Sequence, residues 1–167
     1  MMHDTPLVRT GVPADVDNVM ELALAGAKEN GFLEFNPAKI LGEIWSALNR
    51  HHGLMGVIGP VGGKLEAAIL LRMGQMWYSD ASVLEEKAIF VDPAFRKAHV
   101  GRARLLSDFS KQAADGLGVP LIIGVLSNHR TESKVRLYKR QFGEPAGAFF
   151  LYGAHTGEWR EAVEGTQ

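Results

Sequence analysis

Residues 88–106, AIFVDPAFRKAHVGRARLL, contain a strand, a short basic loop and the start of a helix in direct succession. The apolar run 88–91 predicts a buried strand, and Pro93 ends it because proline cannot donate to the ladder. The basic loop 96–101 then leads into an amphipathic helix that begins near Arg102. A helix N-terminus leaves backbone N–H groups unpaired and favours negative charge. The stretch therefore predicts a site for a phosphate group.

The same stretch resembles the cofactor-binding motif of the GNAT-type N-acetyltransferases. That motif reads Arg/Gln-x-x-Gly-x-Gly/Ala at the start of the helix after the central strand, and it cradles the pyrophosphate of acetyl-CoA. In this chain Arg96 and Gly101 match, and His99 stands in place of the first glycine. The resemblance implies that the pyrophosphate is held by these residues: Arg96, Lys97, His99, Val100, Gly101, Arg102 and Ala103.

His99 is the main departure from the motif. A glycine in such a loop supplies a positive φ or lets the phosphate approach the backbone closely, and histidine does neither freely. In one interpretation His99 donates to a CoA phosphate, and its protonation at lower pH strengthens the contact. In the other, the loop has drifted and binds CoA poorly.

Basic residues cluster in the sequence. Of the 18 Lys and Arg residues, nine lie in two short segments, four in 96–104 and five in 130–140. These segments form either two solvated helix faces or one positive field for a polyphosphate ligand such as CoA. The net charge of −1 argues against a nucleic-acid partner.

Length and composition predict one domain over residues 1–167, with a polar tail at 153–167. The resemblance implies that this domain is GNAT-like, with a core at 7–152. The chain has no cysteine, which excludes disulfides, thiolate metal sites and a cysteine nucleophile. No apolar run approaches the roughly 18 residues of a membrane span, and the N-terminus lacks the apolar core of a signal peptide. We therefore expect a cytoplasmic protein without a membrane partner.

The periodicity of apolar residues predicts the order β-α-α-β-β-β-α-β-α-β. The expected strands are 7–9, 54–59, 65–73, 84–91, 121–126 and 149–152, and the expected helices are 13–30, 37–48, 102–117 and 131–141. The fold class is thus α/β, with a central mixed sheet flanked by helices. This order also resembles the GNAT fold, from Leu7 to Tyr152. Residues 134–143, KVRLYKRQFG, are similar to the late helix of that family, although Phe142-Gly143 reverses its usual Gly-Phe.

The resemblance implies transfer of an acetyl group from acetyl-CoA to an amine, by direct attack in a ternary complex. It places the pantetheine arm of CoA along Phe90 and Val91 of the central strand. The apolar strand expected at 121–126 would be buried on both faces. Just after it, Asn128 is either a ligand of the pantetheine amides or an N-cap of the next helix. The acceptor, a small molecule or a peptide, is not readable from the sequence.

The resemblance also implies an acid and a base. Tyr138 occupies the position of the acid that protonates the departing thiolate, and its phenol is protonated at neutral pH. Its alternative role is a half-buried core residue. Glu85 occupies the position of the base, and alternation along the strand lets only one of Glu85 and Glu86 face a given site. Their alternative role is that of solvated residues beside Lys87.

Three further expectations complete the sequence-based picture. His51 and His52 have no partner at helical spacing, so we expect no metal site. A homodimer through the late strands is compatible with the sequence, although no interface pattern marks it. Two other functions stay open. One is a degenerate GNAT-fold binding or assembly module without activity, and the other is a CoA-dependent acyltransferase for a longer acyl group.

Overall fold

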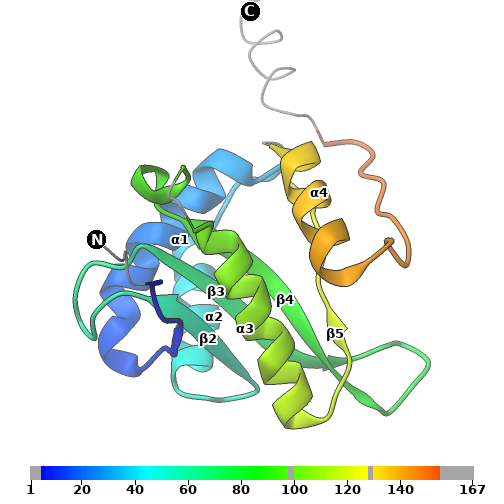
Figure 1. Cartoon of the computed structure of the whole chain (residues 1–167), viewed down its shortest axis with the longest axis horizontal. Coiled ribbons are helices and arrows are strands. Elements are labelled where there is room, and N and C mark those ends of the chain that lie inside the picture. The colour runs from blue at the N-terminus through cyan, green and yellow to red at the C-terminus, as the bar shows by residue number, and fades with distance from the viewer. Residues whose placement is uncertain (1–4, 98–99, 128–129, 155–167) are drawn as a thin grey trace, which may run out of the picture.

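A five-stranded mixed sheet lies between two helical layers in the computed structural model, which describes residues 5–97, 100–127 and 130–154 (Figure 1). The strands are β1 (Arg9–Thr10), β2 (Gly53–Ile58), β3 (Ala67–Gln75), β4 (Ser82–Val91) and β5 (Leu121–Ile122). The helices are α1 (Val16–Asn30), α2 (Pro37–Leu48), α3 (Arg102–Leu117) and α4 (Thr131–Phe142), with 3-10 turns η1 (Pro13–Asp15) and η2 (Pro93–Phe95). The predicted α/β class is confirmed.

The strands follow the order of the chain across the sheet, β1-β2-β3-β4-β5. Neighbours are antiparallel except for β4 and β5, which are parallel. The register between β3 and β4 shifts once, because Leu70 pairs with Ala88 whereas Leu71 pairs with Glu86. Lys87 is therefore the extra residue of a β-bulge, and a bulge re-aims the side chains that follow it.

Each face of the sheet has its own apolar core. Helices α1 and α2 cover one face, where Val19, Ile44 and Leu48 pack against residues of β2 and β3. Helix α3 covers the other face, where Leu106 packs with Ile69 and other strand residues (Figure 1). Both layers rest on fully or almost fully buried side chains, whose removal from water is the main favourable contribution to folding.

Local signals place the helix ends as expected. The side chain of Asn36 accepts hydrogen bonds from the N–H groups of Ala38 at 3.0 Å and Lys39 at 3.3 Å, so it caps α2 ahead of Pro37. Helix α3 ends at Gly118, whose φ of 68° lies in the left-handed region that glycine enters without strain.

Two predicted strands differ from the structure. The run 121–126 forms a strand only at Leu121–Ile122, and its residues are half-buried or exposed rather than buried on both faces. No strand forms at 149–152, where Phe150 is 95% and Tyr152 is 101% exposed. An apolar run becomes a strand only where a neighbouring strand pairs with it. Among the described residues, no strand pairs with residues 123–126 or with residues 149–152. A dimer through the late strands stays a prediction.

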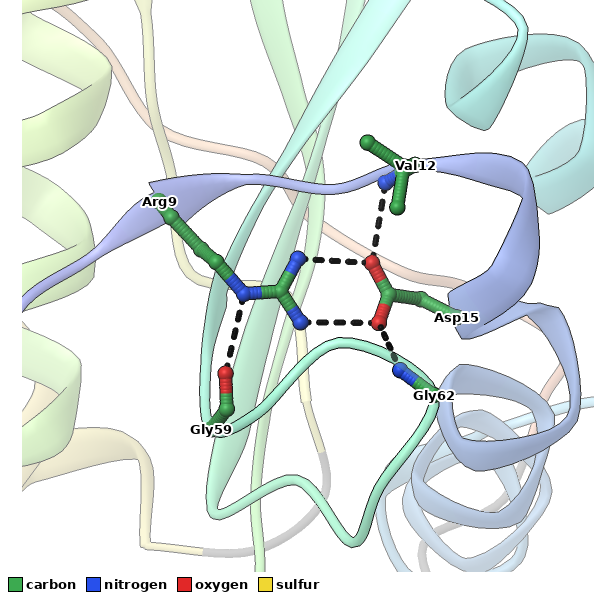
Figure 2. A network of polar contacts seen from close by, with 5 residues as sticks. All are labelled: Arg9, Val12, Asp15, Gly59 and Gly62. Carbon is green, nitrogen blue, oxygen red and sulfur yellow. Dashed lines mark hydrogen bonds and ion pairs between the residues drawn. The ribbon is translucent and has the colours of Figure 1, made fainter.

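A buried ion pair ties the start of α1 to two other segments (Figure 2). The guanidinium of Arg9 donates two hydrogen bonds of 2.8 Å to Asp15, which is 0% exposed. Asp15 also accepts from the N–H groups of Val12 at 2.9 Å and Gly62 at 3.2 Å, and Arg9 donates to the carbonyl of Gly59 at 2.9 Å. The network therefore joins β1, η1 and the β2–β3 turn.

This network sets the charge state of Asp15. Burial by itself raises the pKa of Asp15, but the hydrogen bonds from Arg9, Val12 and Gly62 outweigh burial and lower it below its ordinary value. The same hydrogen bond raises the pKa of Arg9. Both groups are therefore charged at neutral pH, and the buried carboxylate of Asp15 is paired with the half-buried guanidinium of Arg9.

In the described residues, none of the helices is both long enough and apolar enough to cross a membrane.

Candidate functional site

The candidate site lies where β4 and β5 diverge. The two strands pair only at Leu84–Leu121 and Glu85–Ile122, at the start of β4. Beyond this point, no pairing of β4 with β5 occurs in the described residues, although β4 stays paired with β3 up to Val91. The edge of β4 facing β5 is therefore unpaired over residues 86–91, and its backbone polar groups can bind another molecule.

A groove of about 110 Å³ lies at the end of β4, between this strand and α1. Phe90, Val91 and Arg96 line one side, and Gly26 and Glu29 of α1 line the other. A Cβ atom at Gly26 would lie 2.6 Å from Cδ1 of Phe90, so α1 and β4 approach this closely only because residue 26 is glycine. Phe90 and Val91, expected to contact pantetheine, thus border the groove.

The loop after β4 ends in an uncapped helix N-terminus. Asp92 starts η2 by accepting a hydrogen bond of 2.9 Å from the N–H of Ala94. Gly101 is the N-cap of α3 and makes no side-chain cap hydrogen bond to the first turn of this helix. The first-turn N–H groups, including that of Ala103, have the partial positive charge that attracts a phosphate.

Two arginines of the loop are bound to carboxylates. Arg96 pairs with Glu29 of α1 at 2.6 Å. Arg102 pairs with Glu66 at 2.9 Å and donates to the carbonyl of Val100 at 2.7 Å, and its guanidinium lies 5.4 Å from the ring centre of Phe95. An incoming phosphate would have to share or replace these carboxylates.

The other residues predicted for this site are distributed as follows. Lys97 and Gly101 are exposed, and Val100 and Ala103 are half-buried. His99 and Asn128 lie outside the described residues. Their predicted contacts with CoA stay predictions, as do those of the other loop residues.

The adjacent glutamates of β4 lie on opposite faces of the sheet. Glu85 pairs across the strands with Arg72, whose guanidinium binds Glu43 of α2, so Glu85 faces the α1 and α2 layer. There it forms an ion pair of 3.0 Å with Lys87. Glu86 pairs with Leu71, which belongs to the core under α3, so Glu86 faces the α3 and α4 layer. The role predicted for Glu85 stays a prediction.

Glu86 and Tyr138 interact electrostatically across the space between β4 and α4. Burial raises the pKa of Glu86 to about 7, against the N–H of Gly124 and the charges of Lys134 and Lys87, which lower it. Burial, and secondly the charge of Glu86, raise the pKa of Tyr138, while a hydrogen bond with Ser107 lowers it. Tyr138 is therefore protonated at neutral pH, and Glu86 changes charge near neutrality.

Lys134 connects the walls of the site. Its Nζ donates to Oδ1 of Asn30 at 3.1 Å and to Oγ of Ser127 at 3.0 Å. Burial lowers the pKa of Lys134, and the nearby charges of Glu29 and Glu86 oppose this shift. The last turn of α1 is thus joined both to the loop after β4, through Arg96, and to α4, through Lys134.

The raised pKa of Glu86 predicts a pH-dependent stability change in Glu86→Gln. The unfolded chain releases the Glu86 proton near pH 4.3, whereas the folded protein holds it up to about pH 7. The wild type therefore loses stability as pH rises between these values, and glutamine removes this loss. We expect Glu86→Gln to be more stable than the wild type by about 1 to 3 kcal/mol above pH 7.

Urea unfolding at pH 4.5 and pH 8.5 measures this difference. The gain should be small at the lower pH and full at the higher one. An equal gain at both values would contradict the raised pKa.

Sequence reasoning missed three contributors to the site. Glu86 was left as the neighbour of the expected base, because the register that decides its face depends on the bulge at Lys87. Lys134 enters the sequence analysis only as one of the five basic residues of 130–140, and Glu29 does not enter it. Their positions in the last turn of α1 and the first turn of α4 were available from the predicted helix ends, but their partners were not.

In the described residues, no group of three or more His, Asp or Glu could hold a metal ion.

No protein-family model matches the sequence, and a search of curated proteins finds no match. Solved structures do match. A possible acetyltransferase from Clostridium difficile 630 aligns with a TM-score of 0.65 at 17% identity, over 89% of this chain and 97% of that chain. AAC(6')-Iy, in complex with the bisubstrate analogue CoA-S-monomethyl-acetylneamine, aligns with a TM-score of 0.65 at 16% identity, over 89% of this chain and 97% of that chain.

A third solved structure is also similar to this chain. The ribosomal-protein-alanine N-acetyltransferase from Brucella melitensis biovar Abortus 2308 aligns with a TM-score of 0.63 at 12% identity, over 88% of this chain and 97% of that chain. The chain therefore has the fold of the GNAT-type acetyltransferases. At these identities the likeness establishes the fold alone, and the activity has to be argued from the site.

Proposed function

We propose that this protein is an N-acetyltransferase that moves an acetyl group from acetyl-CoA to an amine. The observation that carries the proposal is the divergence of β4 and β5 beside an uncapped helix N-terminus, in a chain with an acetyltransferase fold. Such a site offers unpaired backbone groups to an amide-containing arm and N–H groups to a phosphate. Acetyl-CoA contains both.

The uncapped start of α3 would bind the pyrophosphate, together with Arg96, Lys97 and Arg102. The carboxylates of Glu29 and Glu66 now balance two of these cations. Charge-assisted hydrogen bonds from guanidinium to phosphate would compensate for the loss or sharing of these ion pairs. The pantetheine arm would then follow the unpaired edge of β4 past Val91 and Phe90. His99 and Asn128 are proposed as further contacts on the basis of sequence.

The chemistry needs an amine without its proton, a polarised thioester carbonyl and a proton for the departing sulfur. A backbone N–H on the unpaired edge of β4 would polarise the carbonyl. The Tyr138 phenol, which keeps its proton at neutral pH, would donate it to the thiolate. The amine would attack directly while both substrates are bound, as the resemblance to the family implies. An acetyl-cysteine intermediate is excluded, because the chain has no cysteine.

The acceptor is proposed to be a small molecule with an amino group. A solved structure of similar fold is an aminoglycoside acetyltransferase in complex with sisomicin, and AAC(6')-Iy is in complex with the bisubstrate analogue CoA-S-monomethyl-acetylneamine. In this chain a second hollow lies at the end of α1, lined by Gly31, Leu33, Glu34 and Phe35 among others. Ala27 and Lys28 complete its lining, so the hollow is mostly apolar and has one carboxylate, Glu34, and one ammonium, Lys28. Glu34 would pair with an amino group of a partly apolar acceptor.

A thiol-release assay tests the proposal directly. The protein contains no cysteine, so every thiol that reacts with a chromogenic disulfide comes from CoA. Acetyl-CoA is incubated with the protein and a panel of aminoglycosides, polyamines, amino acids and peptides. We expect thiol release that depends on both the amine and the protein, with an acetylated amine in the mass spectrum. Binding of acetyl-CoA without transfer to any amine would favour the alternative, a non-catalytic binding module.

A further inference from the structure

We propose that the ring of Phe90, packed on the backbone of Gly26, makes this protein selective for acetyl over longer acyl groups. The inference rests on the proposed acyl transfer and adds a specificity-determining residue to it. It also decides between two functions that the sequence leaves open, since an acyltransferase for longer acyl groups would need more room at this place.

The path of the cofactor brings the acyl group to Phe90. In the proposed function the pyrophosphate lies at the start of α3, and the pantetheine arm follows the unpaired edge of β4 past Val91 and Phe90. The thioester is at the far end of this arm. The acyl group that it carries would therefore lie beside the groove between β4 and α1.

The acyl group would turn toward α1 rather than toward α3. Side chains at the end of β4 alternate between the two helical layers. Ile89 and Val91 pack in the core under α3, whereas Phe90 pairs with Ala68 and packs on the core under α1 and α2. The groove of about 110 Å³ opens on the side of α1. An acyl chain that extends beyond the thioester would therefore meet Phe90.

The ring of Phe90 fills the space between β4 and α1 as far as the helix backbone. A Cβ atom at Gly26 would lie 2.6 Å from Cδ1, 3.2 Å from Cε1 and 3.7 Å from Cγ of the ring. One edge of the ring thus lies directly against α1, in the space that a side chain at position 26 would need. The ring is half-buried and lines the groove. A longer acyl chain could pass between β4 and α1 only by displacing it.

Displacing this ring is unfavourable, because it packs against the core cluster that contains Leu22 and Ala23. A close-packed interior accepts even one additional methylene only with shifts of its side chains or backbone. In a close-fitting site, one methylene changes kcat/KM by about tenfold to two-hundredfold. The contact of Phe90 with α1 therefore discriminates between acyl groups that differ by one or two carbons.

The rim of the groove is also unfavourable to an alkyl chain. Its charged side chains come from both walls: Glu21, Glu29, Lys64, Asp92 and Arg96. An alkyl chain laid over these groups would displace their water and offer no hydrogen bond in return. A longer acyl group is therefore disfavoured both at the ring and along the rim.

Transfer rates with acetyl-CoA and butyryl-CoA test the inference, with the amine that the thiol-release panel identifies as acceptor. The amine nitrogen bonds to the acyl carbon, the C–S bond breaks, and CoA leaves as a thiol with the proton that the amine loses. The same assay therefore counts both acyl groups. Wild-type kcat/KM should be at least about tenfold higher for acetyl-CoA than for butyryl-CoA.

Removal of the ring should abolish this preference. In Phe90→Ala the two values of kcat/KM should lie within about threefold of each other, because the space of the ring becomes available to the longer chain. Phe90→Leu keeps an apolar side chain without a ring. It should shift the preference in the same direction, and it replaces the alanine variant if that variant does not fold.

Phe109→Leu is the matched control. Phe109 of α3 is also half-buried and also packs on a glycine, since a Cβ atom at Gly56 would lie 2.5 Å from its Cδ1. This contact belongs to the core on the other face of the sheet. Phe109→Leu should therefore lose stability and keep the wild-type preference for acetyl-CoA.

Calorimetry measures the same limit without an acceptor. The wild type should bind acetyl-CoA more tightly than butyryl-CoA, and Phe90→Leu should bind the two with equal affinity. Phe109→Leu should keep the difference that the wild type shows.

The outcomes separate the inference from the proposed function. A wild type that uses both acyl-CoAs equally well, or Phe90 variants that keep the wild-type preference, would refute the inference while the function stands. Loss of the preference in Phe109→Leu as well would show a general loosening of the core and would also refute it. If the wild type transfers neither acyl group to any amine, the proposed function fails. Equal calorimetric affinities of the wild type for the two acyl-CoAs would then refute the role of Phe90 separately.

Discussion

Asp15→Ala is expected to lose about 3–5 kcal/mol of folding stability, because it removes a fully buried carboxylate and leaves the half-buried guanidinium of Arg9 without its partner. In the folded protein Arg9 donates two hydrogen bonds of 2.8 Å to Asp15. The N–H groups of Val12 and Gly62 lose their acceptor in the same variant (Figure 2). A small domain has only about 5–15 kcal/mol in total, so this one substitution removes a large share of it.

Urea unfolding at pH 7 measures the loss, and Asp15→Asn provides a milder variant if alanine does not fold. Glu43→Ala is the matched control. Glu43 forms an ion pair of 2.6 Å with Arg72, which is shorter than the Arg9–Asp15 pair. The side chains of Glu43 and Arg72 are, however, both more than a third exposed. Exposed pairs contribute about 0–1 kcal/mol, so the control should lose little. Equal losses in Asp15→Ala and Glu43→Ala would contradict the importance given to burial.

The pH dependence of the same pair has a defined sign. The pKa of Asp15 is lowered on folding, so its contribution is present above the unfolded pKa of about 3.9 and is lost as pH falls through the folded value. The difference between wild type and Asp15→Asn should therefore shrink below about pH 4.

Tyr138→Phe is expected to lower kcat by about a hundredfold while acetyl-CoA affinity changes less than threefold. The substitution removes the proton that the proposed mechanism gives to the departing thiolate. It keeps the ring, which packs edge-on against Phe142 with centroids 5.8 Å apart. Stopped-flow thiol release with the acceptor from the panel measures kcat, and calorimetry measures affinity.

Tyr78→Phe is the control, because Tyr78 is 70% exposed in the turn between β3 and β4. It should retain wild-type activity. A Tyr138→Phe variant within twofold of wild-type kcat would refute Tyr138 as the acid. Loss of acetyl-CoA binding in that variant would instead indicate that Tyr138 holds the cofactor.

The elements around the candidate site follow from local signals in the sequence. Pro93 ends a strand, Gly101 begins a helix, and Asn36 caps another, and each of these effects depends on the residue and its near neighbours. The extent of β5 could not be predicted in this way. Residues 121–126 are uniformly apolar, but only Leu121–Ile122 pair with β4 because the two strands diverge. The apolar segment 149–152 likewise has the composition of a strand, but no strand in the described part of the chain pairs with it.

The candidate site, too, was predictable from the sequence only where local signals place its residues. The position of Tyr138 on a late helix was predictable from periodicity, and so was the uncapped start of α3. The faces of the sheet on which Glu85 and Glu86 lie were not predictable, because they depend on the pairing of Glu86 with Leu71 and on the bulge at Lys87. The ion pair of Arg96 with Glu29 joins residues far apart in the chain. No local pattern reports such a contact.

Calorimetric titration with acetyl-CoA tests the central claim, that the site between β4 and β5 holds this cofactor. The wild type should bind at micromolar concentration. Arg96→Ala should bind at least about tenfold more weakly, because a charge-assisted hydrogen bond to phosphate is lost and Glu29 is left to repel the ligand. Lys39→Ala makes the same change of charge on an exposed position of α2 and should bind as the wild type does. Absence of binding at millimolar acetyl-CoA, or equal affinity in Arg96→Ala and the wild type, would contradict the account.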